Sequence, residues 1–171
     1  MSRQPSQPLQ PLIWLGLPML LSIVATLLLA APLRVFGLAL PEPVFPMVLA
    51  FSWAVIRPSV LGPFALLLIG LFQDLFWGGP LGLWPLSLLI AYFIALLTRN
   101  LMVGQSGAVL WGWYAALTLL AVGCAYLFSL LGSGVVPNLT ATGLTVLVTA
   151  VLYPAAHQLI DRFEDADVRF R

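Results

Sequence analysis

The chain has 171 residues, of which 61% are hydrophobic and only 8% are charged. Soluble globular domains carry about 25% charged residues, so this composition excludes an ordinary water-soluble domain and indicates an integral membrane protein. The formal net charge of +1 lacks the basic excess that nucleic-acid binding requires, so we expect no nucleic-acid partner.

Six apolar segments, separated by sparse charges and turn-forming residues, are candidate membrane-spanning helices. A span needs about 20 apolar residues to cross about 30 Å of hydrocarbon. The expected spans cover residues 12–31, 44–56, 59–77, 81–98, 108–131 and 141–160. The sequence therefore predicts an all-α polytopic fold with one transmembrane domain at 12–160, a disordered head at 1–11 and a short tail at 161–171.

The first two segments leave alternatives open. Residues 12–31 follow Arg3, as in a signal peptide, but the apolar core exceeds the about 7–15 residues of such a peptide and no A-x-A site follows closely. We expect an uncleaved anchor. The second segment is short, and Pro41, Pro43 and Pro46 lie around its start, so the sequence does not define the path of residues 32–46.

The last two segments lie in an uncharged stretch from Asn100 to Ile160, which turn formers at 132–138 divide. Pro154 predicts a kink or a local opening of the backbone in the sixth span. His157 and Asp161 are one helical turn apart and can pair. Cys124 is expected to be a small buried apolar residue. We expect no metal site and no cofactor, because one Cys and one His do not make a metal-ligand cluster.

Arginines predict the orientation, because cytoplasmic loops carry an excess of positive charge. With the N-terminus inside, six of the seven arginines fall on the cytoplasmic side, and Arg34 falls outside. The six are Arg3, Arg57, Arg99, Arg162, Arg169 and Arg171. The expected topology therefore has both termini in the cytoplasm.

Asp74 is the one acidic residue beside the core of a span, near the C-terminal end of the third. A charge there is costly, and the helix macrodipole disfavours a carboxylate at that end. We expect Asp74 to accept N–H groups from the glycine-rich loop at 78–82 and from the start of the fourth span, which stabilises a tight outer turn. The alternatives are a proton- or cation-carrying role and an ion pair with Arg34 or with a partner's arginine.

Tryptophans flank the same loop. Trp77 and Trp84 are expected to lie in an interfacial belt, and a Trp-lined ligand pocket is the alternative. No Ser, Cys or His lies beside both a base and an orienting acid within one span, so we expect no enzymatic activity.

The segment around Asp74 resembles the rod shape-determining protein MreD family of bacteria. The resemblance rests on an Arg-Pro pair before the third span, on a G-x-x-x-D-x-x-x-G-x-P-L-G-L run, and on Ala91-Tyr92 in the fourth span. The matching positions are Arg57, Pro58, Gly70, Asp74, Gly78, Pro80, Leu81, Gly82 and Leu83. Trp77 and Gly79 stand where the family tends to carry smaller or polar residues.

The resemblance implies a non-enzymatic scaffold of the bacterial elongasome in the inner membrane, needed for rod shape and lateral peptidoglycan synthesis. It implies a single-span MreC-type partner and, indirectly, the MreB filament, the RodA glycosyltransferase and a class B penicillin-binding protein. It also implies a six-helix fold similar to the substrate-binding subunits of vitamin transporters.

Small residues recur in the fifth and sixth spans, where helices can approach closely in lipid. A partner helix is therefore expected to dock on a face that includes Gly123 and Ala150. The alternative function is a small-molecule-binding or transport subunit, which predicts a cavity of several hundred Å3 with convergent polar groups.

Overall fold

The structure is a computed structural model that describes residues 12–29, 34–35, 38–39, 41–56, 59–102, 104–133 and 136–168. Arg57 and Pro58, the first pair of the MreD-like pattern, lie outside these residues. A short π-helical turn, Leu12–Gly16, leads into α1 (Leu17–Leu29). Two-residue strands β1 (Arg34–Val35) and β2 (Leu38–Ala39) pair antiparallel before the next helix.

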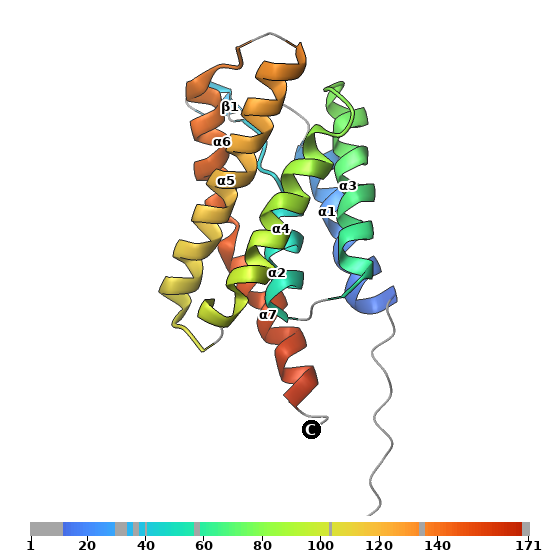
Figure 1. Cartoon of the computed structure of the whole chain (residues 1–171), viewed down its shortest axis with the longest axis vertical. Helices are drawn as coiled ribbons and strands as arrows, with labels where there is room; N and C mark the ends of the chain where they lie inside the picture. The colour runs from blue at the N-terminus through green and yellow to red at the C-terminus, as the bar shows by residue number, and fades with distance from the viewer. Residues whose placement is uncertain are drawn as a thin grey trace, which may run out of the picture.

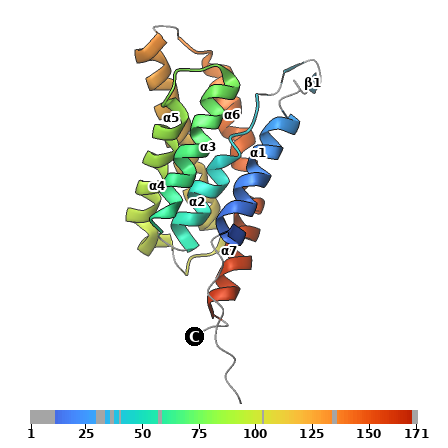
Figure 2. The same cartoon turned by 90° about the vertical axis from the view of Figure 1, so that its right-hand side faces the viewer.

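The remaining elements are helices: α2 (Pro46–Ile56), α3 (Leu61–Trp77), α4 (Leu83–Met102), α5 (Gly107–Ser133), α6 (Leu139–Val151) and α7 (Tyr153–Val168). They run roughly along one axis (Figure 1). The α3–α4 and α5–α6 turns lie at one end of the bundle, whereas the start of α1 and the end of α7 lie at the other. Figure 2 shows β1 at the same end as those two turns.

The expected all-helical fold is confirmed, but the helices differ in length. Three described helical runs are long and apolar enough to cross a membrane: Leu83–Met102, Gly107–Gly132 and Leu139–Asp161, which combines α6 with part of α7. The other three apolar helices, Trp14–Leu29, Pro46–Ile56 and Leu61–Trp77, are shorter. At 1.5 Å per residue, the 11-residue α2 spans only about 17 Å.

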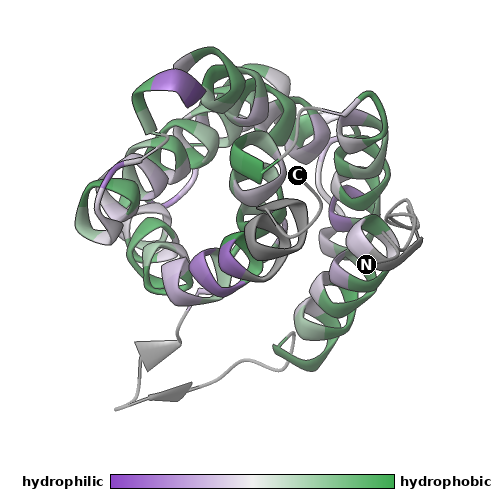
Figure 3. Ribbon diagram, turned by 90° about the horizontal axis from the view of Figure 1, so that it is seen from below, coloured by the Kyte–Doolittle hydropathy of each residue, from purple (hydrophilic) through white to green (hydrophobic). Residues whose placement is uncertain are grey.

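Apolar side chains cover the outside of the described bundle as well as its core. Buried polar residues include Ser22 and Thr26 on α1, whereas leucines on the same helix, such as Leu28, are up to 74% exposed. Large hydrophobic side chains are exposed on most of the helices from α1 to α6. Figure 3, a view from below, shows that hydrophobic residues occur on all of the helices drawn in colour. Apolar surface on this scale is typical of protein or membrane contact sites and is compatible with a membrane protein.

The short helix α2 is at the centre of the bundle. It packs against α1, α3, α4, α5 and α7, and eight of its eleven residues, from Pro46 to Ala54, are buried. A helix that is apolar all round is buried. In the core, the Phe51 and Tyr114 rings meet edge to face at 5.3 Å, which joins α2 to α5.

Candidate functional site

The turn between α3 and α4 is organised by Asp74. Its side chain is 1% exposed, and Oδ2 accepts the N–H of Gly82 at 2.6 Å, while Oδ1 accepts the N–H of Trp84 at 3.0 Å. Gly82 immediately precedes α4 and has no side chain to cap that helix. Asp74 therefore supplies, from the preceding helix, the carboxylate that an N-capping residue ordinarily provides.

This arrangement explains how a buried carboxylate is tolerated at the end of α3. The carboxylate lies at the N-terminus of α4, where unpaired N–H groups and the positive end of the macrodipole stabilise a negative charge. The loop and the start of α4 are the two sources of N–H groups that we expected from the sequence. The alternative pairing with Arg34 concerns a side chain that lies outside the described part of the structure.

The glycines of the pattern have separate roles. A Cβ on Gly70 would lie 2.6 Å from both the Cα and the N of Pro85, so the backbones of α3 and α4 are in close contact there. Gly78 ends α3 in the left-handed region at φ 66°, and its N–H donates to the carbonyl of Asp74. Gly82 is also left-handed, at φ 96°, and L side chains rarely adopt such values.

The other two turn residues complete the connection. The carbonyl of Pro80 accepts the N–H of Leu83 at 3.3 Å, and the Leu81 side chain is 71% exposed at the tip. All described members of the MreD-like run from Gly70 to Leu83 thus belong to one helical hairpin. Tyr92, from the Ala91-Tyr92 pair, is buried in the same hairpin and donates through its hydroxyl to the Ser59 carbonyl at 3.4 Å.

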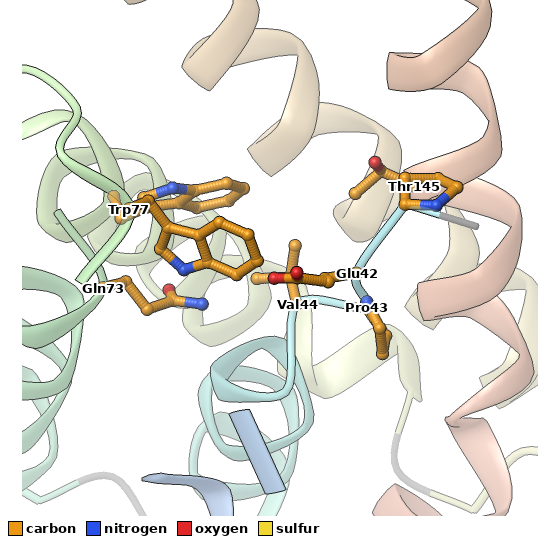
Figure 4. A pocket seen from close by; sticks show the side chains of 8 residues that line it. Glu42, Pro43, Val44, Gln73, Trp77 and Thr145 are labelled. Atoms are coloured by element: carbon orange, nitrogen blue, oxygen red, sulfur yellow. The ribbon is translucent and has the colours of Figure 1, made fainter. Parts of the chain in front are cut away.

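Next to this hairpin is a pocket with a volume of about 320 Å3. It is lined by Pro41, Glu42, Pro43, Val44, Gln73, Trp77, Trp84 and Thr145 (Figure 4). The wall of the pocket thus comes from the irregular segment before α2, the end of α3, the start of α4 and the middle of α6. Both tryptophans that flank the loop in the sequence are part of its wall, as the alternative of a Trp-lined pocket predicts.

Two acceptor atoms of this pocket have no protein partner. Glu42 Oε2 and Gln73 Oε1 are buried and accept no hydrogen bond from any described residue. Burial raises the pKa of the Glu42 carboxyl above its ordinary value, because desolvation penalises the charged form. Sequence reasoning did not find Glu42, since its neighbours in the pocket come from distant parts of the chain.

Arg99 has a role that its position in the sequence did not reveal. Its Nε donates to the carbonyl of Val55 at 2.9 Å, and one terminal nitrogen donates to the carbonyl of Ile56 at 3.3 Å. These carbonyls end α2, where a cation is favoured. The acid at the end of α3 thus caps the start of α4, and an arginine of α4 caps the end of α2.

The helical run from Leu139 is interrupted at Leu152, two residues before Pro154, so the helix is broken next to the proline. Proline has no N–H to donate to the carbonyl of Ala150. Trp111 on α5 donates through Nε1 to that carbonyl at 3.2 Å, and the Tyr114 hydroxyl donates to the carbonyl of Thr149 at 3.2 Å. Side chains of α5 thus compensate for the broken helix ladder.

The two positions of the expected partner face differ in accessibility. Ala150 is 8% exposed and packed within the chain's own bundle, whereas Gly123 is half-buried, and a Cβ added to it would meet no atom within 4 Å. The two residues therefore do not form one open helix face, and of the pair only Gly123 offers space for a partner. Cys124 beside it is a half-buried free cysteine rather than a fully buried one.

The remaining candidates carry little chemistry. His157 Nδ1 lies 3.5 Å from an Asp161 carboxylate oxygen, which confirms the expected pair, and both side chains are substantially exposed. Within the described ranges, no three His, Cys, Asp or Glu residues come together as a metal site would require.

No protein-family model, curated protein or solved structure matches this chain.

Proposed function

We propose that this protein is a non-enzymatic scaffold of the MreD type in the bacterial inner membrane. In this role it binds a single-span MreC-type protein and, through it, connects to the MreB filament, RodA and a class B penicillin-binding protein. The chain would cross the membrane six times with both termini in the cytoplasm. Its contribution to rod shape and lateral peptidoglycan synthesis would be structural.

The observation that supports the proposal is that the residues of the family-like run all belong to the α3–α4 hairpin and build it. In the family-like run, Gly70 permits helix contact, Asp74 caps α4, and Gly78 and Gly82 form the turn. Each of these positions thus has a structural task, and the carboxylate is occupied by backbone N–H groups rather than free for chemistry. A pattern whose members serve packing and capping favours a scaffold over an enzyme.

The direct test is co-purification of the tagged chain from its native membrane in a mild detergent, with the bound proteins identified by mass spectrometry. We expect an MreC-like protein near equal stoichiometry. Recovery of an energising ATPase pair with a small molecule, and no MreC-like protein, would contradict the scaffold role.

Gly123→Leu tests the partner face on α5, because its surroundings leave room for a side chain. Gly16→Leu is the matched control, since a Cβ there also meets nothing within 4 Å. We expect Gly123→Leu to reduce recovery of the partner at least fivefold and Gly16→Leu to leave it unchanged. Equal recovery with both variants would remove Gly123 from the interface.

A second candidate is a small-molecule-binding or transport subunit, similar in fold to the substrate-binding subunits of vitamin transporters. The observation that favours it is the pocket of about 320 Å3 with Glu42 and Gln73 in its wall, a volume within the range of small-molecule sites. A scaffold can also bind a ligand, so the pocket alone does not distinguish the two candidate functions. The identity of the co-purified protein does.

A further inference from the structure

The pocket between α3, α4, α6 and the segment before α2 has a chemical character of its own. Its two unpartnered buried atoms, Glu42 Oε2 and Gln73 Oε1, are both hydrogen-bond acceptors. Gln73 as a whole is 2% exposed. In Figure 4 the Glu42 carboxylate points to the side of the pocket where Trp77 and Gln73 lie. A buried acceptor without a partner is costly, so the complementary ligand is a donor.

The charge and the aromatic residues of the pocket wall indicate the chemical class of the ligand. Among the described residues, the pocket wall contains one ionisable group, Glu42, and no basic side chain. The wall also contains the indole rings of Trp77 and Trp84, and indole faces attract cations more strongly than other aromatic rings do. A carboxylate beside two indoles is an arrangement suited to organic ammonium groups.

The backbone supports a binding role for this place. Residues 41–44 belong to neither a helix nor a strand, and all four line the pocket. Pro41, Pro43 and Pro46 have no N–H groups to satisfy, and the N–H of Val44 donates to Thr149 Oγ1 at 3.0 Å. The segment is thus held in place without using the Glu42 carboxylate.

We propose that this pocket binds an organic ammonium ion, with the Glu42 carboxylate as counter-ion, Gln73 Oε1 as a hydrogen-bond acceptor and the Trp77 and Trp84 indoles as a cation-binding wall. The ammonium group belongs either to a lipid headgroup or to a free small molecule. This site is distinct from the partner face on α5 and does not depend on the scaffold role.

The test is isothermal titration of the purified full chain in a non-ionic, amine-free detergent with choline. The trimethylammonium group of choline has no N–H and would interact with the indoles and the Glu42 charge, whereas its hydroxyl is the donor for Gln73 Oε1. The uncharged isostere of choline, 3,3-dimethylbutan-1-ol, has the same shape and no charge. We expect choline to bind, the isostere to bind at least tenfold more weakly, and Glu42→Gln to lose at least tenfold in choline affinity. Asp161→Asn is the matched control, because it removes an exposed carboxylate outside the pocket, and should bind as the parent does.

Trp77→Leu provides a second variant should Glu42→Gln fail to fold, since Trp77 is 42% exposed and we expect its truncation to leave the fold intact. It should weaken choline binding while leaving binding of the isostere nearly unchanged. Measurable choline binding with equal affinity for the parent, Glu42→Gln and Trp77→Leu, in proteins with matching circular dichroism, would overturn the proposal.

A lipid source is distinguished by native mass spectrometry of the chain released from nanodiscs that contain equal parts of phosphatidylethanolamine and phosphatidylglycerol. Selective retention of phosphatidylethanolamine by the parent, lost in Glu42→Gln, supports the proposal with a headgroup as ligand, even if free choline does not bind. Binding of neither choline nor phosphatidylethanolamine would overturn it. So would choline binding only in Arg34→Gln, because Glu42 would then be satisfied within the chain by Arg34.

Discussion

At the scale of single residues, the carboxylate of Asp74 takes the place of an N-cap side chain for α4. Its contribution can be measured as a change in the free energy of unfolding. Asp74→Asn keeps the size of the side chain but turns one oxygen into a donor that faces an N–H group, either of Gly82 or of Trp84. We expect a loss of about 1–3 kcal/mol in the free energy of unfolding, the usual cost of an unsatisfied buried group. Thermal unfolding in detergent measures the change.

The matched control for Asp74 is Asp161→Asn, whose side chain is largely exposed. Its effect on stability should lie within about 0.5 kcal/mol. An Asp74→Asn variant with parental stability that had lost a proton-coupled flux would instead establish the proton-carrying alternative.

Whereas we expect the Asp74 carboxylate to stabilise the fold, we expect the ionised Glu42 carboxylate to destabilise it. Its raised pKa means that the folded state holds the proton more tightly than the unfolded chain does. The free energy of unfolding therefore falls as pH rises from the ordinary glutamate pKa, about 4.3, through the higher folded value. Glu42→Gln removes this penalty, so we expect the variant to be more stable than the parent at pH 7 and to lose that advantage near pH 4. Melting temperatures of both proteins at the two pH values test it, and an equal difference at both would contradict it.

The sequence separation between two contacting residues decides whether their roles can be predicted without a structure. Asp74 accepts from groups 8 and 10 residues away, so its helix, loop and glycines can be read together. Arg99 bonds carbonyls 43 and 44 residues away, and Glu42 shares a pocket with α3, α4 and α6. Hydropathy and turn signals carry no information about such pairs, so both roles were missed.

At the scale of helices, the contact between α3 and α4 depends on the absence of a side chain at Gly70. Gly70→Ala would place a Cβ 2.6 Å from the backbone of Pro85, which has no flexible end that could move away. We expect a destabilisation of about 1–3 kcal/mol from overpacking, although alanine favours a helix more than glycine does. Unfolding midpoints in detergent measure this effect.

Gly112→Ala is the control for Gly70, because a Cβ there meets no atom within 4 Å. It should be neutral or should stabilise α5 by about 0.5–1 kcal/mol, the ordinary helix-propensity difference. Equal effects of both substitutions would show that the α3–α4 contact adjusts at no cost.

Helix positions were predictable because apolar runs and turn formers are local signals, and the boundaries of α3, α4 and α5 lie close to the expected spans. Helix length was less predictable. Residues 44–56 read as a short span, but α2 begins only at Pro46 because the prolines before it cannot extend a helix with their N–H groups. Its burial on all sides arises from packing against five other helices, which no window along the chain records.

At the scale of the whole molecule, the exposed leucines are compatible with a membrane protein, and the prediction of its topology rests on where the turns between helices lie. The α3–α4 turn and the α5–α6 connection lie at one end of the bundle, and the end of α7 lies at the other (Figure 1). Together with the arginine distribution, this predicts that Leu81 and Leu139 face the outside and that Gln105 faces the cytoplasm. All three positions are exposed and lie in or next to loops.

Single cysteines test this topology in a Cys124→Ala background, with a membrane-impermeant maleimide applied to intact cells. We expect Leu81→Cys and Leu139→Cys to be labelled directly, and Gln105→Cys to be labelled only after the membrane is permeabilised. The physical reason is that α4 and α5 are both long enough to cross the hydrocarbon core, so the loop between them and the two flanking turns must lie on opposite sides. Labelling of all three positions in intact cells would exclude this topology, and labelling of Gln105→Cys alone would invert it and place the Glu42 pocket nearer the cytoplasmic face.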